Sequence, residues 1–374
     1  MISDPKNHRR VLISFLGNIN YDTRARNLRA SLIARGFTVD TVSFDWYDRP
    51  QGGEIPVVKL KKGNSSIGFY LKFAFTVIHK LLFNKYDLYI AADIYNLPFL
   101  SFFAKFRGKS LFYDSRELFR YLAGLTGKKN VQSLLSFIEK SYIDDCDKII
   151  VTGMMDAEVL IEDYKLSVDK FILLRNLPNT VSEVVPKDLK QKYSLPDNAV
   201  ILIYQGVVVK GRGLSKIIEL LPKKDLLHFI ILGEGELRSE LENFAQKLGV
   251  ASRVIFAGTV TQDELLLYTA GADIGCTLIE NISKSYYYAL PNKLFEYVAA
   301  GIPVLASNLP QMKKIIDEYG VGKYVNPDNP DDILNALEYL CDPQIRKQIK
   351  CNSVKASKEL NWNTEFSKVS HHFD

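Results

Sequence analysis

The chain has 374 residues, 47% of them hydrophobic, and a formal net charge of +5 at pH 7. This length favours two domains, and the apolar content suffices for two buried cores. The sequence lacks the run of about 18 apolar residues that a membrane-spanning helix needs. It also lacks a signal-peptide pattern at its N-terminus. The four cysteines have no C-x-x-C spacing, so we expect reduced thiols in a cytoplasmic protein.

The net positive charge of the chain lies in its first half. Residues 1–180 contain 26 Lys and Arg against 19 Asp and Glu, whereas the remainder contains 22 against 24, so the net charges are +7 and −2. A basic first half fits an anionic partner, such as a membrane surface or a lipid diphosphate. Nucleic acid is not expected as a partner, because the charges are scattered and no groove-reading motif occurs.

Strand-like apolar runs alternate with helix-like patterns through the first half, which is typical of a parallel sheet built from βα units. The first strand is predicted at 11–16, a loop at 17–22, and a helix at 24–35 that ends at Gly36. Further strands of this sheet are predicted at 38–44, 88–92, 111–113 and 148–152.

The second half repeats the same alternation. Residues 181–198 are polar and contain prolines, so we place a linker there, between an N-terminal domain at 1–180 and a C-terminal domain at 199–350. Strands of the C-terminal domain are predicted at 200–204, 229–232, 253–256, 274–278 and 304–306. The tail from 346 to 373 is predicted to be helical. The predicted fold class is therefore α/β with two domains.

The segment from Leu290 to Val304 carries the clearest functional pattern. Pro291 precedes a predicted helix start, where free backbone N–H groups and the positive dipole end favour an anion. Glu296 lies one turn into this helix, where its carboxylate can accept two hydrogen bonds from a diol such as ribose. The alternative is an ordinary surface glutamate. The pattern predicts a nucleotide site, with phosphate at the helix start and ribose on Glu296.

Other polar residues sit in glycine-containing turns after predicted strands. Arg212 lies between two glycines, and its guanidinium could bind two diphosphate oxygens at once, or it could be an exposed loop arginine. Gly233-Glu234-Gly235-Glu236 is a second turn of a kind common at any strand end. In the first half, Asp22 could cap a helix or belong to a site, and both alternatives stay open.

Five segments resemble, in order, those of the family-4 glycosyltransferases, which have the two-domain GT-B fold. They are Gly17–Arg24, Tyr113–Phe119, Arg175–Asn179, Tyr204–Leu214 and Leu290–Val304. The resemblance implies two Rossmann-like domains facing across a cleft, with a C-terminal helix at 351–374 that crosses back to the first domain. It implies sugar transfer with retention, from a UDP- or GDP-type nucleotide diphosphate sugar to a glycan or lipid-linked acceptor, in polysaccharide or glycan biosynthesis. The expected location is the cytoplasm, including the inner face of the cytoplasmic membrane.

The resemblance also implies roles for particular residues, without a cofactor or a metal ion. Glu296 would hold the ribose hydroxyls, and the donor site would further include Pro291, Asn292, Leu294, Gly206, Gly233, Gly235, Val260 and Tyr288. The catalytic residues would be Arg212, Lys293 and Arg116. The acceptor side would include Gly17, Asp22 and Arg24.

Three positions depart from the family pattern. Tyr288 stands where the family has a glutamate that contacts the donor sugar, and Glu280 or Asn281 are the nearby polar candidates for that contact. Val207 stands where the family has an arginine, and we expect Lys293 to supply the missing positive charge.

The third departure is Arg116, at a position where many relatives have histidine. Arginine stays protonated, so it can position a group or neutralise a charge but cannot act as a base. It could also simply pair with Asp114 or Glu117. These departures keep open the alternative of a non-catalytic nucleotide-binding relative. A nucleotide-sugar epimerase of the same fold is the second alternative.

Residues 69–83 are strongly apolar, and residues 99–106 and 118–125 add aromatic and basic side chains. The lysines around the first of these segments are Lys61, Lys62, Lys72, Lys80 and Lys85. The segment is either a core helix packed on the sheet or an interfacial patch that contacts an anionic membrane. We predict no metal site at Asp145-Cys146-Asp147, because acidic residues between a helix end and a strand start usually face solvent.

Overall fold

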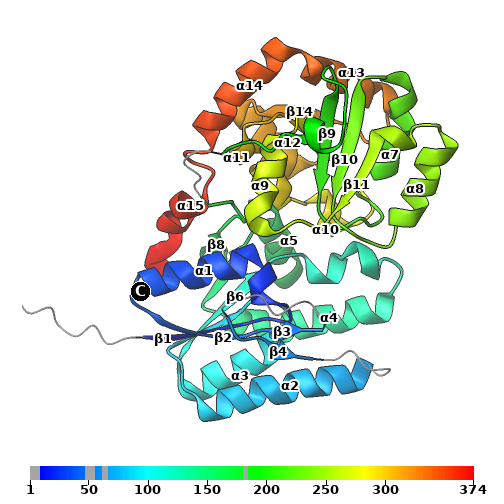
Figure 1. Cartoon of the computed structure of the whole chain (residues 1–374). Helices are drawn as coiled ribbons and strands as arrows, with labels where there is room; N and C mark the ends of the chain where they lie inside the picture. Colours follow the sequence, from blue (N-terminus) through cyan, green and yellow to red (C-terminus); the bar gives the residue numbers. More distant parts are fainter. Residues whose placement is uncertain (1–8, 47–54, 61–65, 180–183) are drawn as a thin grey trace, which may run out of the picture. The chain divides into compact units, whose positions relative to one another are not determined.

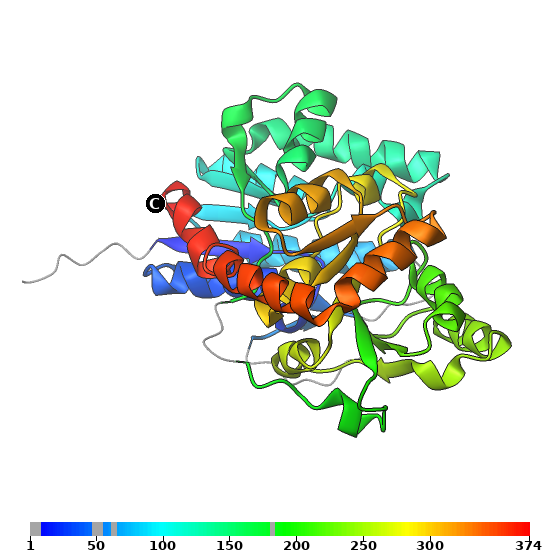
Figure 2. The same cartoon turned by 90° about the horizontal axis from the view of Figure 1, so that it is seen from above.

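The computed structural model of the chain describes residues 9–46, 55–60, 66–179 and 184–374. The chain divides into two compact units, one made of residues 1–176 and 369–374 and the other of residues 177–368. Each unit contains a six-stranded parallel sheet with helices between successive strands (Figures 1 and 2). The predicted α/β class with two Rossmann-like domains is therefore confirmed.

In the first unit the strands lie in the order β2-β1-β5-β6-β7-β8. Their bounds are β1 (Arg10–Ser14), β2 (Thr38–Val42), β5 (Leu88–Ala91), β6 (Ser110–Ser115), β7 (Lys148–Val151) and β8 (Phe171–Leu173). A separate two-stranded sheet pairs β3 (Phe44–Asp45) with β4 (Val58–Lys59). The connecting helices are α1 (Thr23–Ala34), α2 (Ser66–Phe83), α3 (Leu97–Arg107), α4 (Lys129–Tyr142) and α5 (Met154–Tyr164).

The second unit has the strand order β11-β10-β9-β12-β13-β14. The strands are β9 (Val200–Gln205), β10 (Leu227–Leu232), β11 (Val254–Gly258), β12 (Ile274–Thr277), β13 (Val304–Ser307) and β14 (Gly322–Val325). The helices before β13 are α6 (Leu189–Lys192), α7 (Leu214–Leu220), α8 (Arg238–Lys247), α9 (Gln262–Ala270), α10 (Lys284–Tyr287) and α11 (Asn292–Ala300). The later ones are α12 (Pro310–Tyr319), α13 (Pro330–Cys341), α14 (Pro343–Ala356) and α15 (Trp362–Val369).

The second sheet separates two apolar cores, because neighbouring residues of a strand point to opposite faces. Leu202 and Phe229 belong to the core on one face, whereas Ile203 and Ile230 belong to the core on the other. All four side chains are fully buried. A parallel sheet covered on both faces explains why these strands are continuous apolar runs in the sequence.

Two segments differ in detail from the predicted boundaries. Residues 184–198, predicted as part of the linker, include α6, and Leu189 of that helix is buried in a core of the second unit. The predicted linker residues 181–183 lie outside the described residues. The predicted helix at 346–373 is broken between Ala356 and Trp362, where the Asn361 side chain accepts a hydrogen bond from the Thr364 amide (2.9 Å) and caps α15.

Of the segment 351–374, predicted to cross back as one helix, only residues 369–374 belong to the first unit, whereas residues 351–368 belong to the second. The Phe373 ring lies 5.3 Å from the Phe112 ring of β6, measured between centroids. The Asp374 side chain pairs with Arg35 at 2.5 Å. None of the helices in the described residues is long and apolar enough to cross a membrane.

Candidate active site

The strand order of the second sheet reverses direction between β9 and β12. In open parallel sheets, ligands bind beside the carboxyl ends of the strands at such a reversal. The loops that leave these strand ends contain Gly206, Arg212 and Glu280, and the helix that precedes β13 contains Lys293 and Glu296. Fold topology alone therefore brings together residues that are up to 90 positions apart in the sequence.

Glycines let two of these loops touch through their backbones. Gly206 and Gly233 have φ values of +128° and +148°, which favour glycine. The Gly206 amide donates to the Leu232 carbonyl, and the Gly233 amide donates to the Gly258 carbonyl. A Cβ on Gly233 would clash with the Gly206 carbonyl oxygen, and one on Gly235 with the Val208 carbonyl oxygen. Close packing of the loops thus accounts for Gly233 and Gly235 without a ligand.

Glu296 is held by a side-chain relay across three elements. Gln205, the last residue of β9, donates from Nε2 to Oε2 of Glu296. Its own Oε1 accepts a hydrogen bond from the Thr269 hydroxyl of α9 (2.8 Å). Burial raises the pKa of Glu296, while the Gln205 hydrogen bond and the Lys293 charge oppose that rise. The relay fixes the Glu296 carboxylate beside the end of β9, and the sequence analysis missed both Gln205 and Thr269.

Lys293 lies nearly one turn before Glu296, close to the Gly206 loop. Its ammonium nitrogen is 3.8 Å from the centre of the Tyr204 ring and 3.0 Å from where a Cβ on Gly206 would stand. Burial, together with the positive charge of Arg212, lowers the pKa of Lys293 to about 7. Lys293 therefore lies beside the Gly206 loop, and its role as the substitute for a family arginine stays a prediction.

Arg212 is held over an aromatic ring at the other side of the same loop. Its guanidinium carbon is 4.7 Å from the centre of the Tyr286 ring. The flanking Gly211 and Gly213 have φ values of +82° and +66°. The Gly213 amide donates to Oε1 of Glu280 (3.2 Å), so Glu280 ties the β12 loop to the Arg212 loop. This contact gives Glu280 a structural role.

Helix α11 begins without a side-chain cap at Pro291, so no side chain satisfies its first amides there. It ends at Gly301 with φ +74°, and the Ile302 amide donates to the Tyr297 carbonyl, as in a Schellman motif. Asn292 in the first turn is exposed, whereas the Leu294 side chain is fully buried in a core. Leu294 therefore has a packing role, and only its backbone faces the helix start.

The remaining donor-side candidates lie beside these elements. The Tyr288 ring packs against Tyr287 at 4.9 Å between centroids, and its carbonyl accepts from the Gln311 side chain. Val260 is partly buried and packs on the same core as Leu294.

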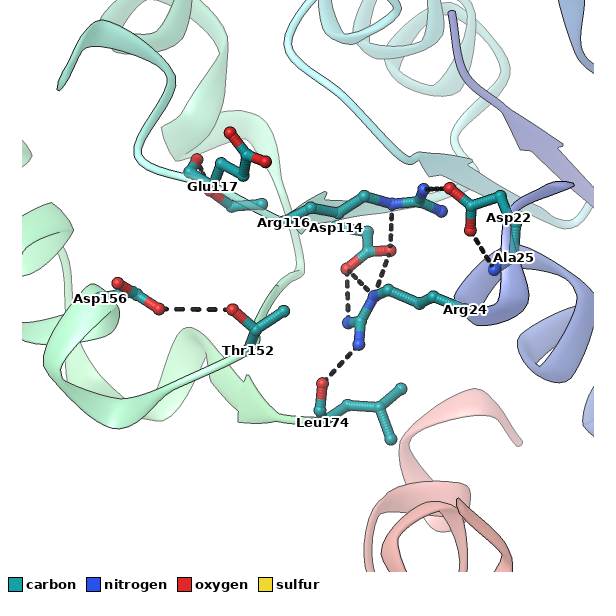
Figure 3. A network of polar contacts seen from close by, with 10 residues as sticks. Asp22, Arg24, Ala25, Asp114, Arg116, Glu117, Thr152, Asp156 and Leu174 are labelled. Atoms are coloured by element: carbon teal, nitrogen blue, oxygen red, sulfur yellow. Dashed lines mark hydrogen bonds and ion pairs between the residues drawn. The ribbon is translucent and has the colours of Figure 1, made fainter. Parts of the chain in front are cut away.

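In the first unit, the acceptor-side candidates Asp22 and Arg24 and the catalytic candidate Arg116 form one ion-pair network around Asp114 (Figure 3). Asp114, at the end of β6, is fully buried and accepts from Nε and Nη2 of Arg24 (3.0 and 2.6 Å) and from Nε of Arg116 (3.1 Å). Burial acts to raise the pKa of Asp114, but the two guanidinium groups outweigh it and lower the pKa. Arg24 also donates to the Leu174 carbonyl (2.6 Å) and is only 2% exposed. Its position is that of a core ion pair.

Asp22 and Arg116 form the outer part of the network. Asp22 accepts from the Ala25 amide (2.7 Å), so it is the N-cap of α1, and its other oxygen pairs with Arg116 Nη1 at 2.5 Å. Arg116 lies over the Phe15 ring (4.8 Å). Its Nη2 is buried without a hydrogen-bond partner among the residues that the structure describes. Nearby, the Gly17 carbonyl accepts from the Phe44 amide (2.8 Å), and a Cβ on Gly17 would touch the Phe15 ring.

The acidic pair at 145 and 147 is engaged within the first unit. Asp145 accepts from the Ser101 hydroxyl (2.9 Å) and pairs with Lys105, and Asp147 accepts from the Leu111 amide (2.8 Å). Across the described ranges, no cluster of three or more His, Cys, Asp or Glu side chains could hold a metal ion.

Comparison with known proteins identifies the second unit. Residues 186–355 match the family model described as "Glycosyl transferases group 1". The chain is 23% identical over 218 residues to alpha-monoglucosyldiacylglycerol synthase of Streptococcus pneumoniae, covering 55% of the chain and 48% of that protein. It is 27% identical over 274 residues to the putative teichuronic acid biosynthesis glycosyltransferase TuaH of Bacillus subtilis, covering 69% and 65%. The chain thus spans about half to two thirds of the length of these relatives.

A solved structure shows the same fold over nearly the whole chain. Alr3699/HepE of Anabaena, solved in complex with UDP-glucose, aligns with a TM-score of 0.74 at 15% identity, covering 98% of this chain and 99% of that one. The fold is therefore that of the GT-B glycosyltransferases. The match of residues 186–355 to the group 1 glycosyltransferase model agrees with the predicted resemblance to the family-4 glycosyltransferases.

Proposed function

We propose that the protein is a retaining glycosyltransferase that takes a sugar from a UDP- or GDP-type nucleotide diphosphate sugar. The observation that carries the proposal is the set of groups at the strand reversal of the second sheet. Glu296 is fixed by Gln205, and the two cations Lys293 and Arg212 flank the Gly206 loop. A carboxylate for ribose hydroxyls beside two cations for a diphosphate is the arrangement that a nucleotide diphosphate sugar requires.

The proposed chemistry uses charge stabilisation by residues of the chain, without a metal ion. The bond between the anomeric carbon and the diphosphate oxygen breaks, and its electron pair goes to the leaving diphosphate. Arg212, Lys293 and the uncapped amides of α11 stabilise that growing negative charge. A bond from the acceptor oxygen to the anomeric carbon forms on the same face. The departing diphosphate oxygen takes the acceptor proton, so no side-chain base is needed.

We further propose a glycan or lipid-linked acceptor, in polysaccharide or glycan assembly at the inner face of the cytoplasmic membrane. Two relatives support this choice, since one is named for a glycolipid and the other for teichuronic acid biosynthesis. The basic first half of the chain fits a phosphate-containing carrier lipid. Arg116, which cannot act as a base, would orient or neutralise such an acceptor.

The test is to incubate the purified chain with UDP-glucose, UDP-galactose or GDP-mannose, with and without a bacterial lipid or glycan extract. Nucleotide release and the anomeric NMR signals of the product are then measured. The proposal predicts release that depends on the extract, and an α-linked product from an α-linked donor. Donor conversion without an acceptor would favour the epimerase alternative. Nucleotide binding without any turnover would favour the non-catalytic one.

A further inference from the structure

Three neighbouring helices of the first unit expose large apolar side chains. Helix α3 contacts α2 on one side and α4 on the other, and α2 and α3 lie side by side in Figure 1. The exposed fractions are 65% for Leu71, 70% for Phe75, 59% for Leu82, 63% for Phe102, 79% for Phe106 and 69% for Phe137. We call these six residues the apolar helix face.

These side chains are not needed for the core of the first unit. Helix α2 already buries Phe73, Val77 and Leu81 on its inner side, at the spacing of a single helix face. Leu71, Phe75 and Leu82 lie on the opposite, outer side, where a helix of a soluble domain usually carries polar residues. The core interpretation of residues 69–83 therefore holds for the inner side of the helix, and the exposed outer side leaves the interfacial interpretation open. In the 118–125 segment, by contrast, Leu118 and Phe119 are buried.

The charged side chains on these helices are almost all cationic. Helices α2, α3 and α4 contain Lys72, Lys80, Lys105, Arg107, Lys129 and Lys140. The one carboxylate in their sequences, Glu139, is only 1% exposed and accepts from the Tyr113 and Tyr164 hydroxyls (2.7 and 2.8 Å). Lys80 and Lys105 pair with Asp40 and Asp145, whereas Lys72, Lys129 and Lys140 have no carboxylate partner among the residues that the structure describes. These three lysines supply the unbalanced positive charge of the helices that carry the apolar helix face. Lys61 and Lys62, also named from the sequence, lie outside the described residues.

An open groove continues from this face between β4 and α2. It has a volume of about 400 Å³, and its walls include Val58, Leu60, Leu71 and Phe75, with Lys72 among its lining residues. Apolar walls with a lysine beside them match a lipid, whose acyl part is apolar and whose phosphate is negative.

We infer that the apolar helix face binds the surface of a bilayer that contains anionic phospholipids. The phenyl and leucyl side chains enter the boundary between headgroups and acyl chains, and the lysines contact the phosphates. This combination favours a membrane over a second protein copy, because two copies of the face would oppose like charges. Membrane binding itself does not depend on the proposed function. Its role does, because that role is to bring the first unit to a lipid-linked acceptor.

The test is flotation of the full-length chain with vesicles of phosphatidylcholine, with or without phosphatidylglycerol, at low and high salt. The wild type should float only with the anionic vesicles and less at high salt. The double variant Phe75→Ser/Phe106→Ser should bind at least about tenfold more weakly, since two exposed phenyl groups no longer insert. Val354→Ser is the matched control, because Val354 on α14 of the second unit is 53% exposed. It should bind as the wild type does.

We also measure the thermal unfolding of the same proteins and titrate them calorimetrically with UDP and with GDP. We expect equal unfolding temperatures, because the replaced rings are solvent-exposed. Equal temperatures would show that the variants fold as the wild type does. The inference is overturned if the wild type does not float, or if the double variant floats as well as the control. It is also overturned if the wild type is a dimer that does not bind vesicles and the substitutions dissociate that dimer, because the face would then bind a second copy of the chain. Flotation without nucleotide binding would leave this inference standing and remove the proposed function.

Discussion

Replacing Lys293 separates its charge from its packing. Lys293→Met keeps the length of the side chain and removes its ammonium, whereas Lys293→Arg stays charged across the accessible pH range. If the ammonium contacts the diphosphate, its loss should cost roughly 1.5–3 kcal/mol, or about 10- to 150-fold in affinity for UDP. Arg212 remains in the methionine variant, so binding should weaken and not vanish.

The pKa of Lys293 adds a pH signature to this prediction. With a pKa of about 7 in the free protein, Lys293 is mostly protonated at pH 6 and mostly neutral at pH 8. If only the protonated form binds, the affinity for UDP should fall about tenfold between these two pH values. The sign follows because a bound diphosphate favours the charged lysine, so binding takes up a proton above pH 7.

The assay is calorimetric titration with UDP from pH 6 to pH 9. The affinity of the wild type for UDP should fall with rising pH. The affinity of Lys293→Arg should fall less, because the arginine stays charged. The ionisation of UDP affects both proteins equally, so the difference between them reports on Lys293. Lys323→Met is the matched control, because its ammonium also lies over a tyrosine ring, 4.4 Å from the centre of Tyr339. Equal affinities of the wild type and Lys293→Met at pH 6 would refute the role given to Lys293.

Gly233→Ala should lower the free energy of unfolding by at least about 2 kcal/mol, because its Cβ would clash with a carbonyl oxygen. Gly249→Ala has φ +70° and no atom within 4 Å of the new Cβ, so it should cost only about 1 kcal/mol. Equal losses in urea unfolding would contradict this packing argument. Arg24→Met should cost roughly 3 kcal/mol at pH 7, because it leaves Asp114 buried with one cation. The lowered pKa of Asp114 means that its contribution is lost in acid, so this difference should shrink below about pH 4, and a constant difference would speak against it.

Elements and their order could be predicted from the sequence because each depends on local patterns. The strand at 200–204 and the helix after Pro291 follow from an apolar run and from a turn residue before a helix start. Lys293 and Glu296 are three residues apart on one helix, so their proximity follows from helix geometry alone.

Contacts between distant segments could not be predicted in this way. Gln205 bonds to Glu296, 91 residues away in the sequence, and Arg24 bonds to Asp114, 90 residues away. No sequence pattern indicates that either pair is in contact. Arg24 shows the same limit, because its residue type and its loop predict a place on the acceptor side but do not predict that it is buried against Asp114. Whether such a residue faces a ligand or pairs inside the core depends on its burial. Burial depends on how the whole sheet and its helices pack, which a local sequence pattern does not show.

The central claim is that the second unit binds a nucleotide diphosphate through Glu296 and its neighbours. The most direct measurement is calorimetric titration of the wild type with UDP, GDP, ADP and dTDP, with Glu296→Ala and the exposed-helix control Glu219→Ala beside it. The account predicts that UDP or GDP binds to the wild type and to Glu219→Ala, and that Glu296→Ala loses this binding. Binding of none of the four nucleotides, or equal binding by Glu296→Ala, would contradict it.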